Sequence, residues 1–206
     1  MKRVIRIAST LSVLCLILGG CTFLQPKPDP TRFFLLTPLA SPEVSPVDAT
    51  DGMSLGLGPI AFPAYLDRPH LVTRVGPNQL SLSEHHRWGE PLPAGFNRVL
   101  AKNLSALLQT QRIVSHPWSR STQLNYRVEI EVRRFEAAAG PETLLTARWI
   151  LLDGTGEKLL LAKEFHITEP ATSETTAASV QALSKALAKL SHEIATSIQL
   201  HAEQEK

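Results

Sequence analysis

Residues 126–135 read YRVEIEVRRF, and their alternation sets the expected fold class. The apolar side chains at every second position are Tyr126, Val128, Ile130 and Val132. The charged ones between them are Arg127, Glu129, Glu131 and Arg133. Because successive side chains of a strand point to opposite faces, this pattern predicts a half-buried strand of an antiparallel sheet with a charged outer face.

Further strands are predicted on both sides of this one. Residues 144–152 and 157–168 form a predicted hairpin around Asp153-Gly154-Thr155-Gly156, and residues 71–75 and 79–83 form another around Gly76-Pro77-Asn78. Shorter strands are expected at residues 32–36, at residues 53–60, and at Ile113 and Val114. Loops are expected at residues 41–52, 61–69 and 84–93.

Two segments have the helical period instead. Residues 94–110 carry an apolar stripe that runs from Phe96 to Leu108, and residues 175–200 carry one from Val180 to Ile198. Together with the strands, they predict an α+β fold: a mostly antiparallel sheet with two helices packed on one face.

The first twenty residues have the pattern of a signal peptide. Lys2, Arg3 and Arg6 precede an apolar run over residues 7–18, which is shorter than the ~20 residues that span a bilayer. The run ends in Leu18-Gly19-Gly20-Cys21, which resembles a bacterial lipobox, so we expect lipidation of Cys21 and cleavage before it. An ordinary signal peptide, or a short buried helix with an incidental cysteine, is the alternative.

The predicted organisation is therefore a signal peptide over residues 1–20, a tether over residues 21–31 and one domain over residues 32–206. The tether contains Pro26, Pro28 and Pro30, which favour extended backbone. Several acyl chains, palmitate among them, would hold the protein stably on a membrane. Thr22 stands where aspartate favours inner-membrane retention in Gram-negative lipoproteins, so we expect the outer membrane, with the domain facing the periplasm.

Charge and cysteine content exclude several classes. Residues 1–20 hold three of the 21 Lys and Arg residues and none of the 19 Asp and Glu residues, so the mature chain is close to neutral. It has no basic excess for binding nucleic acid. Of the two cysteines, Cys15 leaves with the signal peptide and Cys21 is modified. No disulfide and no cysteine metal site is expected.

No active site is predicted. Residues 52–56 (GMSLG) match a nucleophile elbow, but the helix that must follow Ser54 is blocked by Pro59. Residues 56–61 match a dinucleotide fingerprint without the strand and helix that it needs. The seven histidines lack ligand spacing, and the acidic residues offer no acid and base pair. We therefore expect no catalysis, no metal and no cofactor.

Two loop segments contain more aromatic and charged residues than a simple connection between strands needs. Residues 65–69 (YLDRP) and 87–92 (RWGEPL) combine aromatic, charged and proline residues. Exposed Tyr, Trp and Arg are typical anchors of interfaces, so these segments are candidates for partner binding. The residues concerned are Tyr65, Leu66, Asp67, Arg68, Trp88 and Glu90. The alternative is local packing, with Trp88 capping the core.

These segments carry a resemblance to a known family. Residues 57–60 (LGPI), 65–69, 71–74 (LVTR), 78–80 (NQL) and 87–92 resemble the PqiC family of ABC-type transport auxiliary lipoproteins. The similarity runs from about Arg32 to the end of the chain, and the part over residues 57–104 is the specific one.

The resemblance implies a non-enzymatic lipoprotein of an intermembrane lipid-transport system. Its implied partner is a periplasm-spanning MCE-domain protein similar to PqiB, which it would dock at the outer membrane, in support of envelope integrity. Residues 65–69 and 87–92 would contact that partner or a neighbouring copy in a homo-oligomeric ring. The competing hypothesis is an outer-membrane-tethered binding or structural lipoprotein that acts on peptidoglycan or lipid.

Overall fold

The computed structural model describes residues 29–39, 52–119 and 121–204. The chain divides into two compact units, residues 1–30 and residues 31–206, and the second contains all the secondary structure given below. The predicted signal peptide, Cys21 and most of the predicted tether lie outside the described residues. No helix in the described part of the chain has the length and apolar character needed to cross a membrane.

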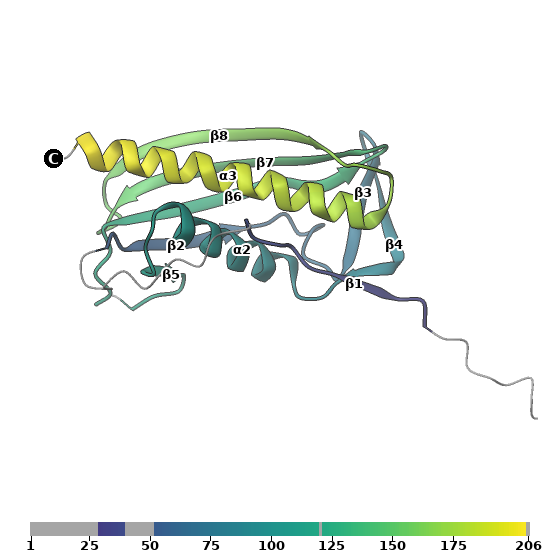
Figure 1. The fold of residues 1–206 in the computed structure, drawn as a ribbon, viewed down its shortest axis with the longest axis horizontal. Helices are drawn as coiled ribbons and strands as arrows, with labels where there is room; N and C mark the ends of the chain where they lie inside the picture. The colour runs from purple at the N-terminus through teal and green to yellow at the C-terminus, as the bar shows by residue number, and fades with distance from the viewer. Residues whose placement is uncertain (1–28, 40–51, 120, 205–206) are drawn as a thin grey trace, which may run out of the picture. The chain divides into compact units, whose positions relative to one another are not determined.

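Within the described residues, eight strands form one sheet and two helices pack against it (Figure 1). In chain order the elements are β1 (Arg32–Phe34), β2 (Leu55–Ala61), β3 (His70–Gly76), β4 (Gln79–Trp88), α2 (Leu92–Leu107), β5 (Ile113–Ser115), β6 (Tyr126–Ala138), β7 (Glu142–Asp153), β8 (Leu159–Pro170) and α3 (Thr176–Gln204). The order of strands and helices predicted from the sequence is confirmed, and the fold is α+β.

The sheet is mixed, and the expectation of a mostly antiparallel sheet is wrong. The hairpins β3–β4, β6–β7 and β7–β8 are antiparallel. The other four pairings among the described strands are parallel: β1 with β4, β2 with β5, β2 with β6, and β3 with β6. The three hairpins join strands that follow each other in the sequence, whereas β6 pairs in parallel with strands that precede it by tens of residues.

β6 organises the sheet. It pairs with β7 along nearly its whole length, and its opposite edge takes β2 in the first half and β3 at the end. The predicted burial of Tyr126, Val128, Ile130 and Val132 is confirmed. A register shift between Val132 and Arg134 then inserts one extra residue, a β-bulge, which returns Phe135 to the buried face.

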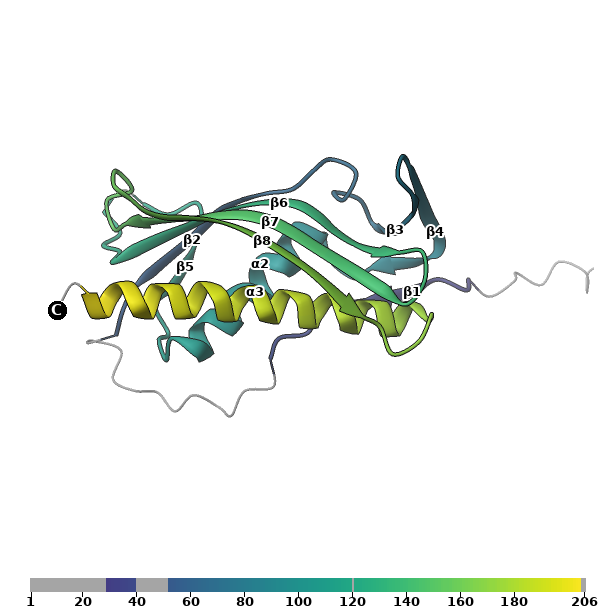
Figure 2. The same cartoon turned by 90° about the horizontal axis from the view of Figure 1, so that it is seen from above.

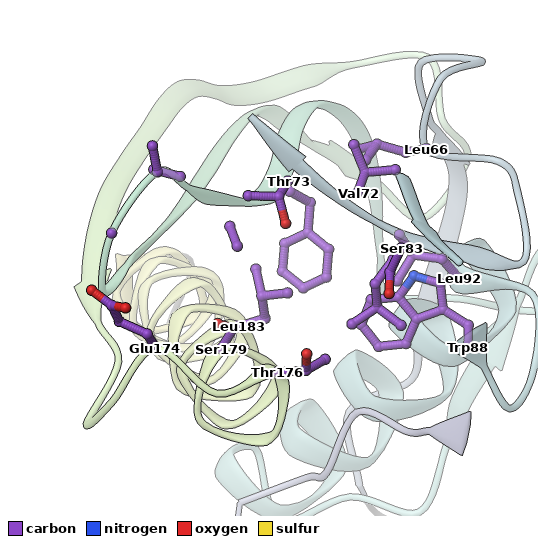
Figure 3. A pocket seen from close by; sticks show the side chains of 16 residues that line it. Leu66, Val72, Thr73, Ser83, Trp88, Leu92, Glu174, Thr176, Ser179 and Leu183 are labelled. Carbon is purple, nitrogen blue, oxygen red and sulfur yellow. The ribbon is translucent and has the colours of Figure 1, made fainter. Parts of the chain in front are cut away.

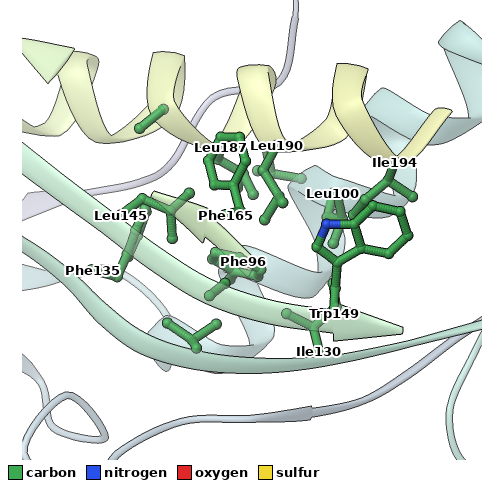
Figure 4. Close-up of a cluster of buried hydrophobic side chains, with 14 of the residues drawn as sticks. Phe96, Leu100, Ile130, Phe135, Leu145, Trp149, Phe165, Leu187, Leu190 and Ile194 are labelled. Carbon is green, nitrogen blue, oxygen red and sulfur yellow. The ribbon is translucent and has the colours of Figure 1, made fainter. Parts of the chain in front are cut away.

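Both helices lie on the same side of the sheet, α3 across β6, β7 and β8 and α2 across β2 (Figures 1 and 2). Their apolar stripes and the inner faces of the strands form one core (Figure 4). Trp149, Phe96 and Phe135 are the largest of its completely buried side chains. Phe96 packs edge-on against Phe135, with ring centroids 5.3 Å apart, so α2 is anchored to the bulged half of β6.

The observed bounds of β4 and α2 differ from the predicted ones at residues 84–93. The expected loop over residues 84–93 is strand up to Trp88, because β4 continues past Ser83 to pair with β1 on one side and the start of β3 on the other. α2 then begins at Leu92, two residues earlier than expected, since proline is tolerated in a first helical turn.

Residues 34–39 are fastened to three elements. This segment continues β1 along the helical side of the unit, and Leu36 is buried in the core. Its backbone bonds are Gly89 N–H to Phe34 O at 2.8 Å, Thr37 N–H to Ser184 Oγ at 3.2 Å, and Leu39 N–H to Asn103 Oδ1 at 2.8 Å. The start of the folded unit is thus tied to β4, α3 and α2.

Candidate functional site

The two segments that the sequence singles out meet in space. In the antiparallel β3–β4 hairpin the first residue of β3 lies beside the end of β4, so His70 pairs with Arg87. The backbone N–H of Trp88 donates to the carbonyl oxygen of Pro69 at 2.7 Å. Together the segments line one groove of about 340 Å³, formed by Asp67, Arg68, Pro69, Trp88, Gly89, Glu90 and Pro91. We call it the 67–91 groove.

The apolar side chains predicted as anchors lie beneath this groove instead of projecting from it. Leu66 is 1% exposed and Trp88 8% exposed, and both belong to the hydrophobic core. Their role in the structure is local packing, which fixes the position of the loops that carry the exposed residues.

Tyr65 supports the groove from the outer face of the sheet. Its hydroxyl donates to Glu136 Oε2 at 2.6 Å, and the Arg74 guanidinium lies over its ring. The Glu136 side chain is fully buried and also accepts from Arg74 Nε at 2.8 Å and Arg134 Nε at 2.9 Å. One buried carboxylate therefore joins the 62–69 loop, β3 and β6.

The protonation of this cluster follows from its contacts. Burial alone would raise the pKa of Glu136, but the hydrogen bonds from Tyr65, Arg74 and Arg134 outweigh it and hold the pKa below its ordinary value. Burial, and then the bond to the Glu136 carboxylate, raise the pKa of Tyr65 to about 12. Glu136 is thus a carboxylate and Tyr65 a neutral donor across the physiological range.

Glu90 lies in the wall of the 67–91 groove opposite the 62–69 loop, and an ion pair holds it in place. Its carboxylate Oε1 accepts from Arg98 Nη2 at 2.6 Å, and this bond raises the pKa of Arg98. The same nitrogen donates to Leu36 O at 3.3 Å, so the wall is joined to α2 and to the segment after β1. A side chain at Gly95 would displace Glu90, since an added Cβ would lie 2.9 Å from its Oε1.

Asp67 and Arg68 are the groove residues with capacity left for a partner. Asp67 is exposed and Arg68 is half-buried, and both line the groove. Among the described residues no hydrogen-bond partner of the buried Arg68 Nε is present. Arg87 Nε and Arg127 Nε are likewise buried without a partner in the described chain, so it is the half-buried position of Arg68 in the groove, and not this atom, that offers a charge to a partner.

Sequence reasoning missed Glu136, Arg74 and Arg98. Glu136 follows the bulge, and its burial on the outer face depends on the 62–69 loop folding over it. The one local signal is the Arg133-Arg134 pair, which interrupts the alternation of β6 and marks the irregularity.

A second cavity lies on the inner side of Trp88, between the β3–β4 hairpin, the turn after β6 and the first turns of α3 (Figure 3). Its volume is about 290 Å³. Trp88 lines both this cavity and the 67–91 groove. The two are separate features that share one wall.

The chemical motifs weighed in the sequence have structural roles. Ser54 is buried, and its hydroxyl donates to Asn125 Oδ1 at 2.8 Å, which joins β2 to the segment before β6. His86 Nδ1 lies 2.9 Å from Thr176 Oγ1 at the start of α3. Within residues 29–39, 52–119 and 121–204, no cluster of three His, Cys, Asp or Glu side chains is placed to hold a metal ion.

The arrangement therefore defines a small α+β domain with a preformed groove on one end of its sheet. Two crystal structures share this fold: an uncharacterized protein (TM-score 0.68, 19% identity, 82% of this chain and 98% of that one) and protein XCC0632 from Xanthomonas campestris (0.66, 19%, 84% and 98%). No curated protein matches the chain.

The sequence itself assigns the family. Residues 34–195 match the family described as the ABC-type transport auxiliary lipoprotein component. The chain belongs to this family, and the resemblance stated from residues 57–104 is confirmed. It is accordingly a lipoprotein component of a transport system.

Proposed function

We propose that this lipoprotein sits on the outer membrane and docks a periplasm-spanning MCE-domain protein there, as part of an intermembrane lipid-transport system. Three observations support the proposal. The chain belongs to a family of transport auxiliary lipoproteins. Its first 21 residues have the pattern of a lipidated signal, with Thr22 rather than aspartate after Cys21. The third is the 67–91 groove, which is the observation that carries the docking role.

The groove is suited to an extended segment of a partner protein. Pro69 and Pro91 give it stiff walls, and the half-buried Arg68 supplies a positive charge. A guanidinium binds a carboxylate through paired hydrogen bonds, so an acidic residue on the incoming segment is the favoured contact.

The groove is also formed before a partner arrives. Trp88 lines the groove from the core, the Tyr65–Glu136 bond holds one loop, and the Glu90–Arg98 pair holds the other. Side chains that are already ordered lose little conformational entropy on binding, which favours recognition by a small surface.

The proposal is tested in native membranes with the tagged full-length protein. Mild crosslinking, affinity purification and mass spectrometry are expected to recover an MCE-domain protein. Arg68→Glu reverses the charge in the groove and is expected to lower that recovery by about tenfold or more. Lys185→Glu makes the same charge change on the exposed side of α3 and serves as the matched control.

Two results would contradict the docking role. One is equal recovery from Arg68→Glu and Lys185→Glu when both variants are folded. The other is recovery of peptidoglycan fragments, with no MCE-domain protein, which favours the tethered binding or structural lipoprotein. Crosslinks from Asp67 to a second copy of this chain would instead assign the groove to assembly of a ring.

A further inference from the structure

The cavity behind Trp88 is lined by both apolar and polar side chains (Figure 3). Its buried lining is apolar and formed by Leu71, Leu92, Phe135, Ala137 and Leu183. Its mouth carries the hydroxyls of Thr73, Ser83, Thr176 and Ser179 and the carboxylate of Glu174. An apolar interior with a polar rim matches an amphiphile whose hydrocarbon part enters and whose head group stays in water.

Small residues keep this space open. One wall is the run Ala137-Ala138-Ala139-Gly140 at the end of β6, in which Ala137 is buried, Ala138 is half-buried, and Ala139 and Gly140 are exposed. A larger apolar side chain at the buried Ala137 would fill part of the cavity and add packing contacts, so the sequence leaves buried contact area unused at this position. Apolar cavities of even about 150 Å³ bind hydrocarbons.

The size of the cavity limits the occupant. At about 290 Å³ it lies at the small end of ligand sites, which run from about 300 to 1,000 Å³. A whole phospholipid is too large, whereas part of a single acyl chain is narrow enough to enter between α3 and the β3–β4 hairpin.

The mouth lies close to the start of the folded unit. Arg32 pairs with His86 in the β1–β4 ladder, and His86 contacts Thr176 at the rim of the cavity. Residues 22–31 separate Arg32 from Cys21, and ten residues reach at most about 36 Å. A lipid anchor on Cys21 would therefore keep this side of the domain within reach of a bilayer.

We propose that this cavity takes the end of one acyl chain of a membrane phospholipid, with the head group left at the hydroxyl-bearing mouth. The inference uses the membrane anchor but does not depend on an MCE-domain partner or on the 67–91 groove. It assigns a lipid contact to the auxiliary lipoprotein itself.

The test uses residues 31–206, the compact unit that contains the entire core. The probe is a phosphatidylethanolamine with a parinaroyl chain, presented in phosphatidylethanolamine vesicles. Binding is measured as energy transfer from tryptophan, because Trp88 lines the cavity. Transfer that saturates with protein concentration is the expected result.

Two variants block the site in different ways. Ala137→Leu adds volume at a buried lining position, and Ser179→Phe adds a ring at a half-buried lining position of α3. Each is expected to weaken probe binding by about tenfold or more, since chain carbons are forced back into water. Ala162→Leu adds the same side chain at an exposed position of β8 and is expected to change nothing.

Three outcomes would overturn the proposal. The first is that the wild-type unit does not bind the probe. The second is that folded Ser179→Phe binds the probe as well as the Ala162→Leu control does. The third is that the unit binds the probe but the lipidated full-length protein does not. The last would mean that the protein's own acyl chain occupies the cavity. Arg68→Glu is expected to leave probe binding intact, so failure of the docking role and failure of the lipid site are distinguishable.

Discussion

Replacing Glu136 by glutamine tests the buried cluster beneath the groove. The side chain keeps its shape but loses its charge, while Arg74 Nε and Arg134 Nε still point at Oε1 from 2.8 and 2.9 Å. Hydrogen bonds to a charged group contribute about 1.5–3 kcal/mol each, against about 1 kcal/mol for neutral ones. Both guanidinium groups remain partly exposed and regain water, so we expect a loss of about 2–3 kcal/mol in the free energy of unfolding.

The same substitution predicts a dependence on pH. The pKa of Glu136 is lower in the folded protein than its ordinary value of 4.5. A carboxyl with a depressed folded pKa contributes stability that is fully present above the unfolded pKa and is lost as the pH falls through the folded one. The difference between wild type and Glu136→Gln is therefore expected to be constant near neutrality and to shrink below 4.5.

Urea unfolding followed by tryptophan fluorescence, at several values between about pH 7 and pH 3, measures both effects. The matched control is Glu131→Gln on the same strand, where the side chain is 54% exposed and the expected loss is below about 1 kcal/mol. Equal losses for the two variants near pH 7 would refute the reasoning, as would a difference that persists unchanged in acid.

Three further substitutions test the packing. Trp149→Ala empties the largest completely buried site and should lower the free energy of unfolding by about 3–5 kcal/mol in urea; a loss under about 2 kcal/mol would contradict this. Asn103→Ala leaves the Leu39 N–H without its 2.8 Å acceptor and should cost about 1–3 kcal/mol, which hydrogen exchange at that amide would report as faster opening. Gly154→Ala places a Cβ against the Leu124 carbonyl oxygen and should lower the Tm clearly, whereas an unchanged Tm would show that the turn can shift.

Local periodicity was enough for the strands and helices but not for their pairing. The alternation of β6 is the same whether its neighbour runs parallel or antiparallel, so the parallel partners β2 and β3 left no local signal. The hairpins β3–β4 and β7–β8 were predictable because short turns force antiparallel pairing, whereas the β6–β7 hairpin was not predicted. The second half of β4, with His85, His86 and Arg87, is polar because much of it is exposed, and its strand character comes from pairing with β1 and β3.

The residues of the candidate site could be predicted from the sequence, but their degree of burial could not. Aromatic, proline and charged residues marked both walls of the 67–91 groove, and the β3–β4 hairpin accounts for their meeting. The burial of Leu66 and Trp88, and the bond between Tyr65 and Glu136 across 71 residues, depend on tertiary packing. The cavity behind Trp88 is likewise invisible in the sequence, since small residues are common in strands that merely pack closely.

The hydrogen bonds of residues 34–39 determine how the fold responds to a pulling force on its N-terminal side. A pull on the chain before Arg32 enters the unit through β1, which runs parallel to β4. A pull along the strand axis loads the bonds of this ladder together, in shear, instead of opening them one at a time. Beyond β1 the bonds of Thr37 and Leu39 pass the load to α3 and α2. A tether attached here transmits force into both helices and the core, and so resists peeling of the sheet from its edge.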